Sequence, residues 1–125
     1  METPDFKKIF SVEEANRTLP LVKEIVKDIL DISHQIRSLS TILGKESDSN
    51  LEIQNLYDDL KERFAELENL GCFYKDWNFQ IGLVDFPAVI GGETVFLCWR
   101  SDEQKIGYFH RIEDGYAGRQ KIPAE

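Results

Sequence analysis

The sequence predicts an α+β domain in which an N-terminal antiparallel helical hairpin packs on a small C-terminal three-stranded antiparallel sheet. Two observations lead to this prediction. Residues 1–70 contain a single glycine and regularly spaced aliphatic residues, which favours helices. Residues 71–125 contain seven glycines and ten aromatic residues, which favours short strands and turns. The 125 residues have room for one core, so we expect one domain over residues 1–125.

The first predicted helix covers residues 11–43 and is interrupted near its start. Ser11 and Glu14 have the spacing of a capping box, which indicates a helix N-terminus. Pro20 lacks an amide hydrogen and disfavours helical geometry at the residue before it. We therefore expect a kink or a restart there, with Thr18 as a second cap.

An apolar residue recurs at every third or fourth position of this helix, which is the pattern of a heptad seam. The seam consists of Val22, Ile25, Ile29, Ile32, Ile36, Leu39 and Leu43. Three heptads are equally typical of one core-facing side of a globular helix. A helix over residues 20–43 would be roughly 36 Å long and would extend past a small sheet. We therefore expect a homo-oligomer through this seam, with two hairpins closing into a four-helix bundle.

The second predicted helix covers residues 51–70. Residues 44–50 (GKESDSN) are small and polar and predict the connection between the two helices. Gly71 is placed to end the second helix in a left-handed cap. One side of this helix is apolar and faces the core; its residues are Ile53, Leu56, Leu60, Phe64, Leu67 and Leu70.

A three-stranded meander is predicted over residues 82–110, followed by a tail over residues 111–125. Gly91-Gly92 forms a two-residue hairpin turn between two apolar runs, and residues 101–104 form a polar four-residue turn. If both turns are tight, Ile90 opposes Glu93 in the first pair of strands. In the second pair, Arg100 would then oppose Lys105.

This register assigns side chains to the two faces of the sheet. Asp85 lies directly opposite Cys98 and diagonally from Arg100, within reach of the arginine side chain. His110 points to the other face of the sheet. A slip of one residue would reverse that assignment.

The formal net charge of −8 has the wrong sign for a general nucleic-acid binder, so we expect no nucleic-acid partner. No apolar run approaches the roughly 20 residues that cross a bilayer, so we expect no membrane span. Cys72 and Cys98 lack metal-site spacing and are typical of buried free thiols, which fits the cytoplasm. We expect no cofactor and no metal site, because no HExxH or CxxC pair is present.

Five strings of the sequence resemble a known family. They are FSVEEANRTLP (10–20), GLVDFPA (82–88), FLCWR (96–100), YFH (108–110) and GYAGR (115–119). Together they are similar to a family of small prokaryotic proteins catalogued only as a domain of unknown function. The resemblance covers nearly the whole chain and implies no reaction, cofactor or partner. It supports the predicted fold and a site in the C-terminal part.

Two functional hypotheses from different classes follow. The first is a self-associating protein-interaction module without catalytic activity, because the helical seam overhangs the sheet and catalytic motifs are missing. The second is a small-anion binder, for phosphate or carboxylate, or a hydrolytic enzyme. It would use Asp85, Arg100, His110 and Arg119, since two arginines and a histidine can hold an anion beside an orienting acid. The glycine loop over residues 114–119 could add backbone amides for an anion.

Overall fold

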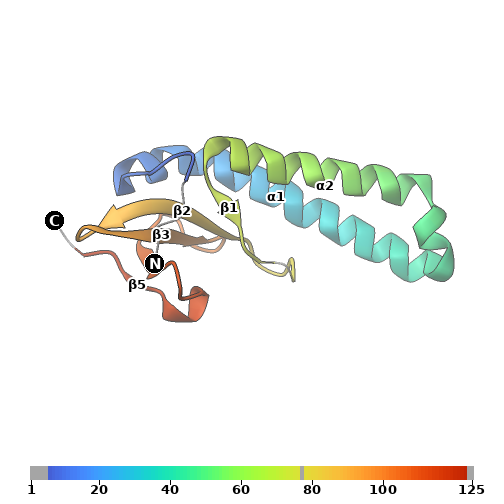
Figure 1. Cartoon of the computed structure of the whole chain (residues 1–125). Helices are drawn as coiled ribbons and strands as arrows, with labels where there is room; N and C mark the ends of the chain where they lie inside the picture. Colours follow the sequence, from blue (N-terminus) through green and yellow to red (C-terminus); the bar gives the residue numbers. More distant parts are fainter. Residues whose placement is uncertain (1–5, 77, 124–125) are drawn as a thin grey trace.

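The computed structural model describes residues 6–76 and 78–123. Helix α1 (Val12–Leu43) and helix α2 (Leu51–Leu70) are joined by the 3₁₀ helix η1 (Gly44–Ser49). The two long helices run antiparallel to each other, as Figure 1 shows, and this confirms the predicted helical hairpin.

Helix α1 begins as predicted but is not interrupted. The Ser11 hydroxyl accepts a hydrogen bond from the Glu14 amide at 3.0 Å, and the capping box is complete. The predicted restart at Pro20 is wrong, because Pro20 lies inside one continuous helix. Pro20 is exposed, so water can supply the hydrogen bond that its missing amide would have made. Thr18 does not act as a cap; its hydroxyl donates to the Glu14 carbonyl within the helix.

Helix α2 has the predicted bounds. The side chain of Asn50 accepts a hydrogen bond from the Ile53 amide at 3.0 Å and caps the helix N-terminus. Gly71 ends the helix with a φ of 98°, in the left-handed region that favours glycine. A Cβ atom at this position would lie 2.8 Å from the Cβ atom of Lys8, so a larger residue would also disturb the segment before α1.

The sheet has five antiparallel strands in the order β1-β2-β3-β4-β5, not the three that the sequence predicts. Both additional strands lie at the edges and have two residues each. A two-residue strand is too short to show the alternation that identifies strands in a sequence. The strands are β1 (Phe73–Tyr74), β2 (Leu83–Ile90), β3 (Glu93–Arg100), β4 (Tyr108–Arg111) and β5 (Gln120–Lys121).

The predicted register of β2 and β3 is confirmed. Ile90 pairs with Glu93 across the tight turn, and Asp85 pairs with Cys98. Both glycines of the turn have positive φ values, of 59° and 79°, which the two-residue turn requires.

The predicted register of β3 and β4 is wrong by one residue. An Arg100 to Lys105 pairing would have placed Phe96 opposite residue 109, whereas Phe96 pairs with His110. Opposed residues share a face of the sheet, so this shift moves His110 to the face that carries Asp85.

The connection over residues 101–107 explains the shift. It is longer than the predicted four-residue turn, because Ile106 belongs to a loop that docks on α1. The Ile106 amide donates to the side-chain oxygen of Asn16 at 2.8 Å. The Trp99 indole also donates to the Glu103 carbonyl at 2.9 Å, which fixes the start of the loop.

One core joins the hairpin to one face of the sheet. It includes Val84, Phe86, Leu97 and Trp99 from the sheet. Four residues of the predicted seam lie in this core of the single chain, and they are Val22, Ile25, Ile29 and Ile36. The remaining three are partly exposed: Ile32, Leu39 and Leu43. Most of the seam thus packs against the core of its own chain, and self-association through the seam stays a prediction.

The far end of the hairpin projects beyond the sheet in Figure 1, as expected from the length of α1. Within the described part of the chain, no helix combines the length and apolar character needed to cross a membrane.

Replacing Asn16 by alanine is expected to lower the free energy of unfolding by about 1–3 kcal/mol, because the Ile106 amide loses its partner. The side-chain amide of Asn16 also donates to the Ile106 carbonyl at 3.3 Å. Urea denaturation measures the change. Asn55→Ala, at an exposed position of α2, is the matched control and should change stability little. Equal effects of the two substitutions would show that Asn16 does not hold the loop.

Candidate functional site

A pocket of about 220 Å³ lies on the face of the sheet turned away from the hairpin. Its strand residues alternate along β2 and β3 with the core residues, so they point to the opposite side. Strands, the segment after β1 and the tail all contribute to the pocket wall. Its lining includes Lys75, Asp85, Phe96, Cys98, His110, Asp114 and Tyr116.

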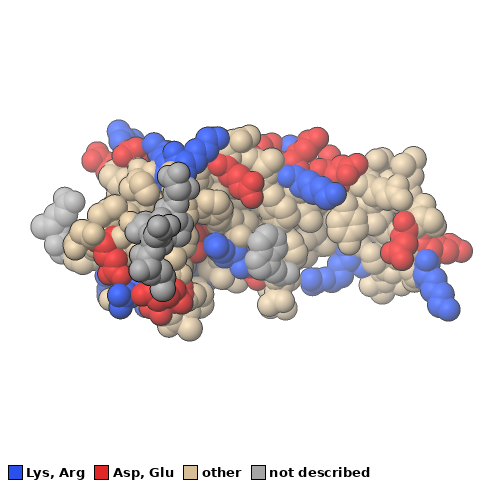
Figure 2. All heavy atoms as spheres, viewed as in Figure 1, with Lys and Arg blue, Asp and Glu red and all other residues tan. Residues whose placement is uncertain are grey.

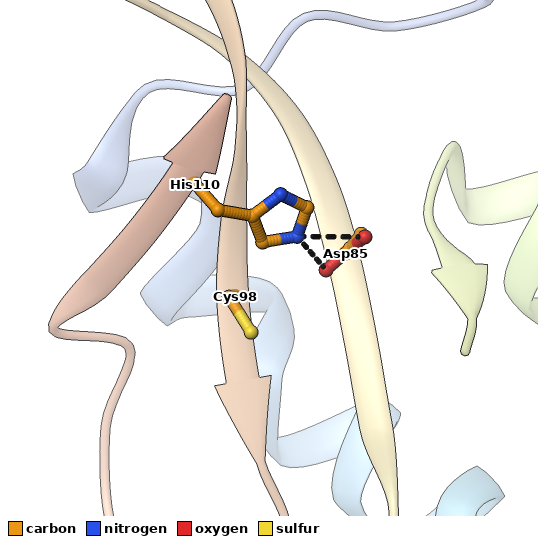
Figure 3. Close-up of side chains that lie close together, drawn as sticks. All are labelled: Asp85, Cys98 and His110. Carbon is orange, nitrogen blue, oxygen red and sulfur yellow. Dashed lines mark hydrogen bonds and ion pairs between the residues drawn. The ribbon is translucent and has the colours of Figure 1, made fainter. Parts of the chain in front are cut away.

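Asp85, Cys98 and His110 meet at this pocket from three neighbouring strands. The His110 ring reaches across β3 to Asp85, and Nε2 lies 3.1 Å from both carboxylate oxygens, as Figure 3 shows. The side chains of Asp85 and His110 are each 5% exposed, and Cys98 is equally buried. One donor atom from each residue lies within 4.8 Å of the other two. The one-residue shift of β4 therefore creates a buried cluster that the predicted register excludes.

The hydrogen bonds of His110 define its protonation state. Nδ1 lies 2.8 Å from the carbonyl oxygen of Arg111, and a carbonyl oxygen only accepts hydrogen bonds. Nε2 faces the Asp85 carboxylate, which also only accepts when it is ionised. With Asp85 ionised, both ring nitrogens therefore carry a hydrogen, and the pair consists of an imidazolium and a carboxylate.

The pKa shifts agree with this assignment. Burial alone lowers the pKa of His110, but the hydrogen bonds to Asp85 and to the Arg111 carbonyl outweigh it, so the pKa of His110 is raised above 6.5. Burial, followed by the charge of Asp85, raises the pKa of Cys98 to about 12. The raised pKa of His110 favours the imidazolium in this cluster, and the raised pKa of Cys98 favours the neutral thiol.

Arg119 holds the tail to the loop that follows β3. Its guanidinium donates to both carboxylate oxygens of Glu103, at 2.8 and 3.0 Å, and to the Cys98 carbonyl at 3.0 Å. The same guanidinium lies 4.1 Å from the ring centroid of Tyr108. Both Nη atoms of Arg119 are therefore used within the chain, whereas its buried Nε has no hydrogen-bond partner among the described residues.

Arg100 is similarly paired, and not with Asp85 as its diagonal position predicts. It donates to both carboxylate oxygens of Asp102, at 2.6 and 2.8 Å, and to the hydroxyl of Tyr116. Arg119 also approaches the Tyr116 ring. Of the four residues predicted to form one site, Asp85 and His110 meet in the pocket. Arg100 and Arg119 form a second cluster around Tyr116, which is part of the pocket wall.

Two amides of the glycine-containing tail are used within its own turn. Gly118 donates to the Gly115 carbonyl and Arg119 to the Tyr116 carbonyl, around the 3₁₀ helix η2 (Tyr116–Gly118). These amides cannot also bind an anion, so the loop offers fewer donors than the sequence suggests.

Lys75 lines the pocket and is not among the site residues that the sequence predicts. It follows β1, which is too short to be predicted, and its ammonium lies 5.4 Å from the Phe96 ring centroid. No carboxylate of the described residues lies within ion-pairing distance of it. The only signal for Cys98 was its predicted position opposite Asp85, which the structure confirms.

The sequence model of one protein family, described as uncharacterised conserved protein (DUF2203), matches residues 8–122. The chain belongs to the DUF2203 family. This confirms the resemblance to a family of unknown function. No curated protein and no solved structure matches the chain. The function of this DUF2203 member is therefore argued from its site, because a fold alone does not define one.

The buried ion pair predicts a pH dependence of stability in this DUF2203 member. Because the pKa of His110 is raised in the folded state, the pair's contribution is full below about pH 6.5 and is lost as the pH rises through the folded pKa. His110→Gln should therefore lower the free energy of unfolding by about 3 kcal/mol at about pH 6 and by less at about pH 9. Urea denaturation with a chelator present measures both values.

The matched control for this prediction is His34→Gln, because His34 is exposed on α1. Its effect on stability should be small at both pH values. A cost of His110→Gln that stays constant or grows with pH would contradict the imidazolium assignment.

Proposed function

We propose that this DUF2203 member binds a small organic monocarboxylate in the pocket on the face of the sheet turned away from the hairpin, its outer face. The observation that supports the proposal most is Lys75, a cation at the pocket with no carboxylate partner among the described residues. It lies beside an Asp85–His110 pair that is already neutral as a whole. A bound carboxylate would neutralise Lys75 without disturbing that pair.

The size and lining of the pocket favour a small ligand with an apolar body. The pocket volume of about 220 Å³ limits the ligand to a small molecule. Leu83, Phe96 and Ile112 provide apolar wall around the polar groups. The rest of the lining is polar and includes Lys75, Asp85, His110, Asp114 and Tyr116, so the pocket suits a ligand with both an apolar body and a polar group.

A single negative charge fits better than a phosphate dianion. Arg100 and Arg119 already bind Asp102 and Glu103 through paired hydrogen bonds. A dianion would have to displace one of these carboxylates, whereas a monocarboxylate needs only Lys75.

Binding fits the geometry better than hydrolysis. A general base must have a ring nitrogen free to take a proton, but both nitrogens of His110 are engaged by Asp85 and the Arg111 carbonyl. Cys98 is a protonated thiol, because its pKa is raised to about 12, and a thiol is a poor nucleophile.

Lys75→Gln tests the proposal with benzoate as the probe, on chelator-treated protein. Calorimetry should show saturable binding to the unmodified chain and about tenfold weaker binding to the variant, because a charged hydrogen bond is lost. Lys75→Arg should restore much of the affinity. Lys61→Gln, which makes the same charge change at an exposed position of α2, is the matched control. Equal benzoate affinities for Lys75→Gln and Lys61→Gln would overturn the proposal, as would no binding to the unmodified chain.

Self-association is the second candidate function, and one observation favours it. Large apolar side chains are exposed at the free end of the hairpin, with Ile42 78% and Leu51 69% exposed. Exposed apolar residues close together are typical of interaction surfaces. Acidic and basic side chains are interspersed along the hairpin in Figure 2, so repulsion between like charges does not oppose the approach of a second copy.

The double substitution Ile42→Asp and Leu51→Asp is expected to convert an assembled protein to a monomer without unfolding it, because both side chains are exposed. Native mass and circular dichroism are the measurements. Substitutions of Ile29 or Ile36 are unsuitable, since both are buried and an aspartate there would unfold the chain. A monomeric unmodified chain, or an assembly that survives both substitutions, would reject this candidate.

We also propose the cytoplasm as the location. Both cysteines are free and buried, and a reducing compartment keeps them so.

A further inference from the structure

We propose that Asp85, Cys98 and His110 form a binding site for one divalent transition-metal ion of the zinc type. The inference goes beyond the proposed carboxylate binding, because the ion can bind whether or not an organic ligand occupies the pocket. No sequence motif signals this site, since its three residues come from three strands.

The positions of the donor atoms fit a tetrahedral ion. Zinc bound to nitrogen, sulfur and oxygen at its usual bond lengths holds these atoms about 3.3–3.6 Å from one another. Here Nε2 of His110 lies 3.1 Å from both oxygens of Asp85, and all three donor groups, Cys98 Sγ included, lie within 4.8 Å. Small side-chain rotations therefore close the site, and the backbone of the three paired strands can stay in place.

The orientation of His110 is already that of a metal ligand. Metal-binding histidines usually donate their other ring N–H to a carbonyl or a carboxylate, which fixes the ring and its tautomer. Nδ1 of His110 makes such a bond to the Arg111 carbonyl at 2.8 Å, and Nε2 points into the cluster.

The charges balance when the ion binds. The thiol proton of Cys98 and the Nε2 proton of His110 leave to water, and the ion takes their place. The thiolate and the Asp85 carboxylate then neutralise the two positive charges, so the buried site remains neutral. Sulfur and imidazole ligands select a zinc-type ion over calcium or magnesium, which prefer oxygen.

The fourth coordination position would face the pocket. Three protein ligands with an open position are typical of zinc sites that exchange water for a ligand. All three residues line the same cavity, so a water molecule or a carboxylate has room to complete the coordination.

Cobalt(II) titration of the chelator-treated full chain tests the site, because a cobalt–thiolate bond gives a near-ultraviolet charge-transfer absorption. The unmodified chain should bind one ion and show this band. Cys98→Ser should lose the band and bind cobalt about tenfold more weakly or worse. The matched control is Cys72→Ser, which changes an equally buried thiol that donates to the Leu67 carbonyl, and it should keep both properties. Zinc content after dialysis, measured by mass spectrometry, should be the same in the unmodified chain and Cys72→Ser and lower in Cys98→Ser.

His110→Gln provides a second test that does not depend on the thiol. It should keep the circular dichroism spectrum and lose stoichiometric cobalt binding. A chain that binds no cobalt, or a band that survives in Cys98→Ser or disappears in Cys72→Ser, would overturn the site. Benzoate binding to chelator-treated protein is a separate measurement, so failure of the metal site and failure of the proposed carboxylate binding can be told apart.

Discussion

The docking of the loop after β3 onto helix α1 is the constraint on which the candidate site depends. The side chain of Asn16 binds both backbone groups of Ile106. The connection between β3 and β4 is therefore longer than the predicted four-residue turn. The resulting register places His110 opposite Phe96 and on the face of Asp85. The contact between Asn16 and the loop thus favours the register that brings the His110 imidazole to the Asp85 side of the sheet.

A buried ion pair on the outer face of a small sheet requires support from its surroundings, because desolvation opposes both charges. Two further contacts supply that support. The Arg111 carbonyl satisfies the second nitrogen of His110. Arg119, bound to Glu103, places the tail beside the Cys98 backbone and stacks on Tyr108. The carboxylate pairings of the arginines therefore build the pocket wall, which explains why they are unsuited to bind a ligand themselves.

The elements that local chemistry defines could be predicted from the sequence, and those that distant contacts define could not. The end of α2 at Gly71 and the β2–β3 register across Gly91-Gly92 depend on neighbouring residues, and both predictions are confirmed. The β4 register depends on a contact between residues 90 positions apart, which no periodicity reveals. The partner of Arg119 was equally undetermined, because the chain offers 23 acidic residues and only folding selects Glu103, 16 positions away.

The cluster of Asp85, Cys98 and His110 has the same net charge in two chemical states. Without an ion, the aspartate and the imidazolium cancel and the thiol is neutral. With a divalent ion, the aspartate and the thiolate cancel its charge, and the imidazole is neutral. The cluster therefore adds no net charge to oppose Lys75 in either state, and Asp114 is the other acidic residue that lines the pocket. A monocarboxylate would consequently meet a favourable cation whether the cluster holds protons or a metal ion, so the two proposals are compatible on electrostatic grounds.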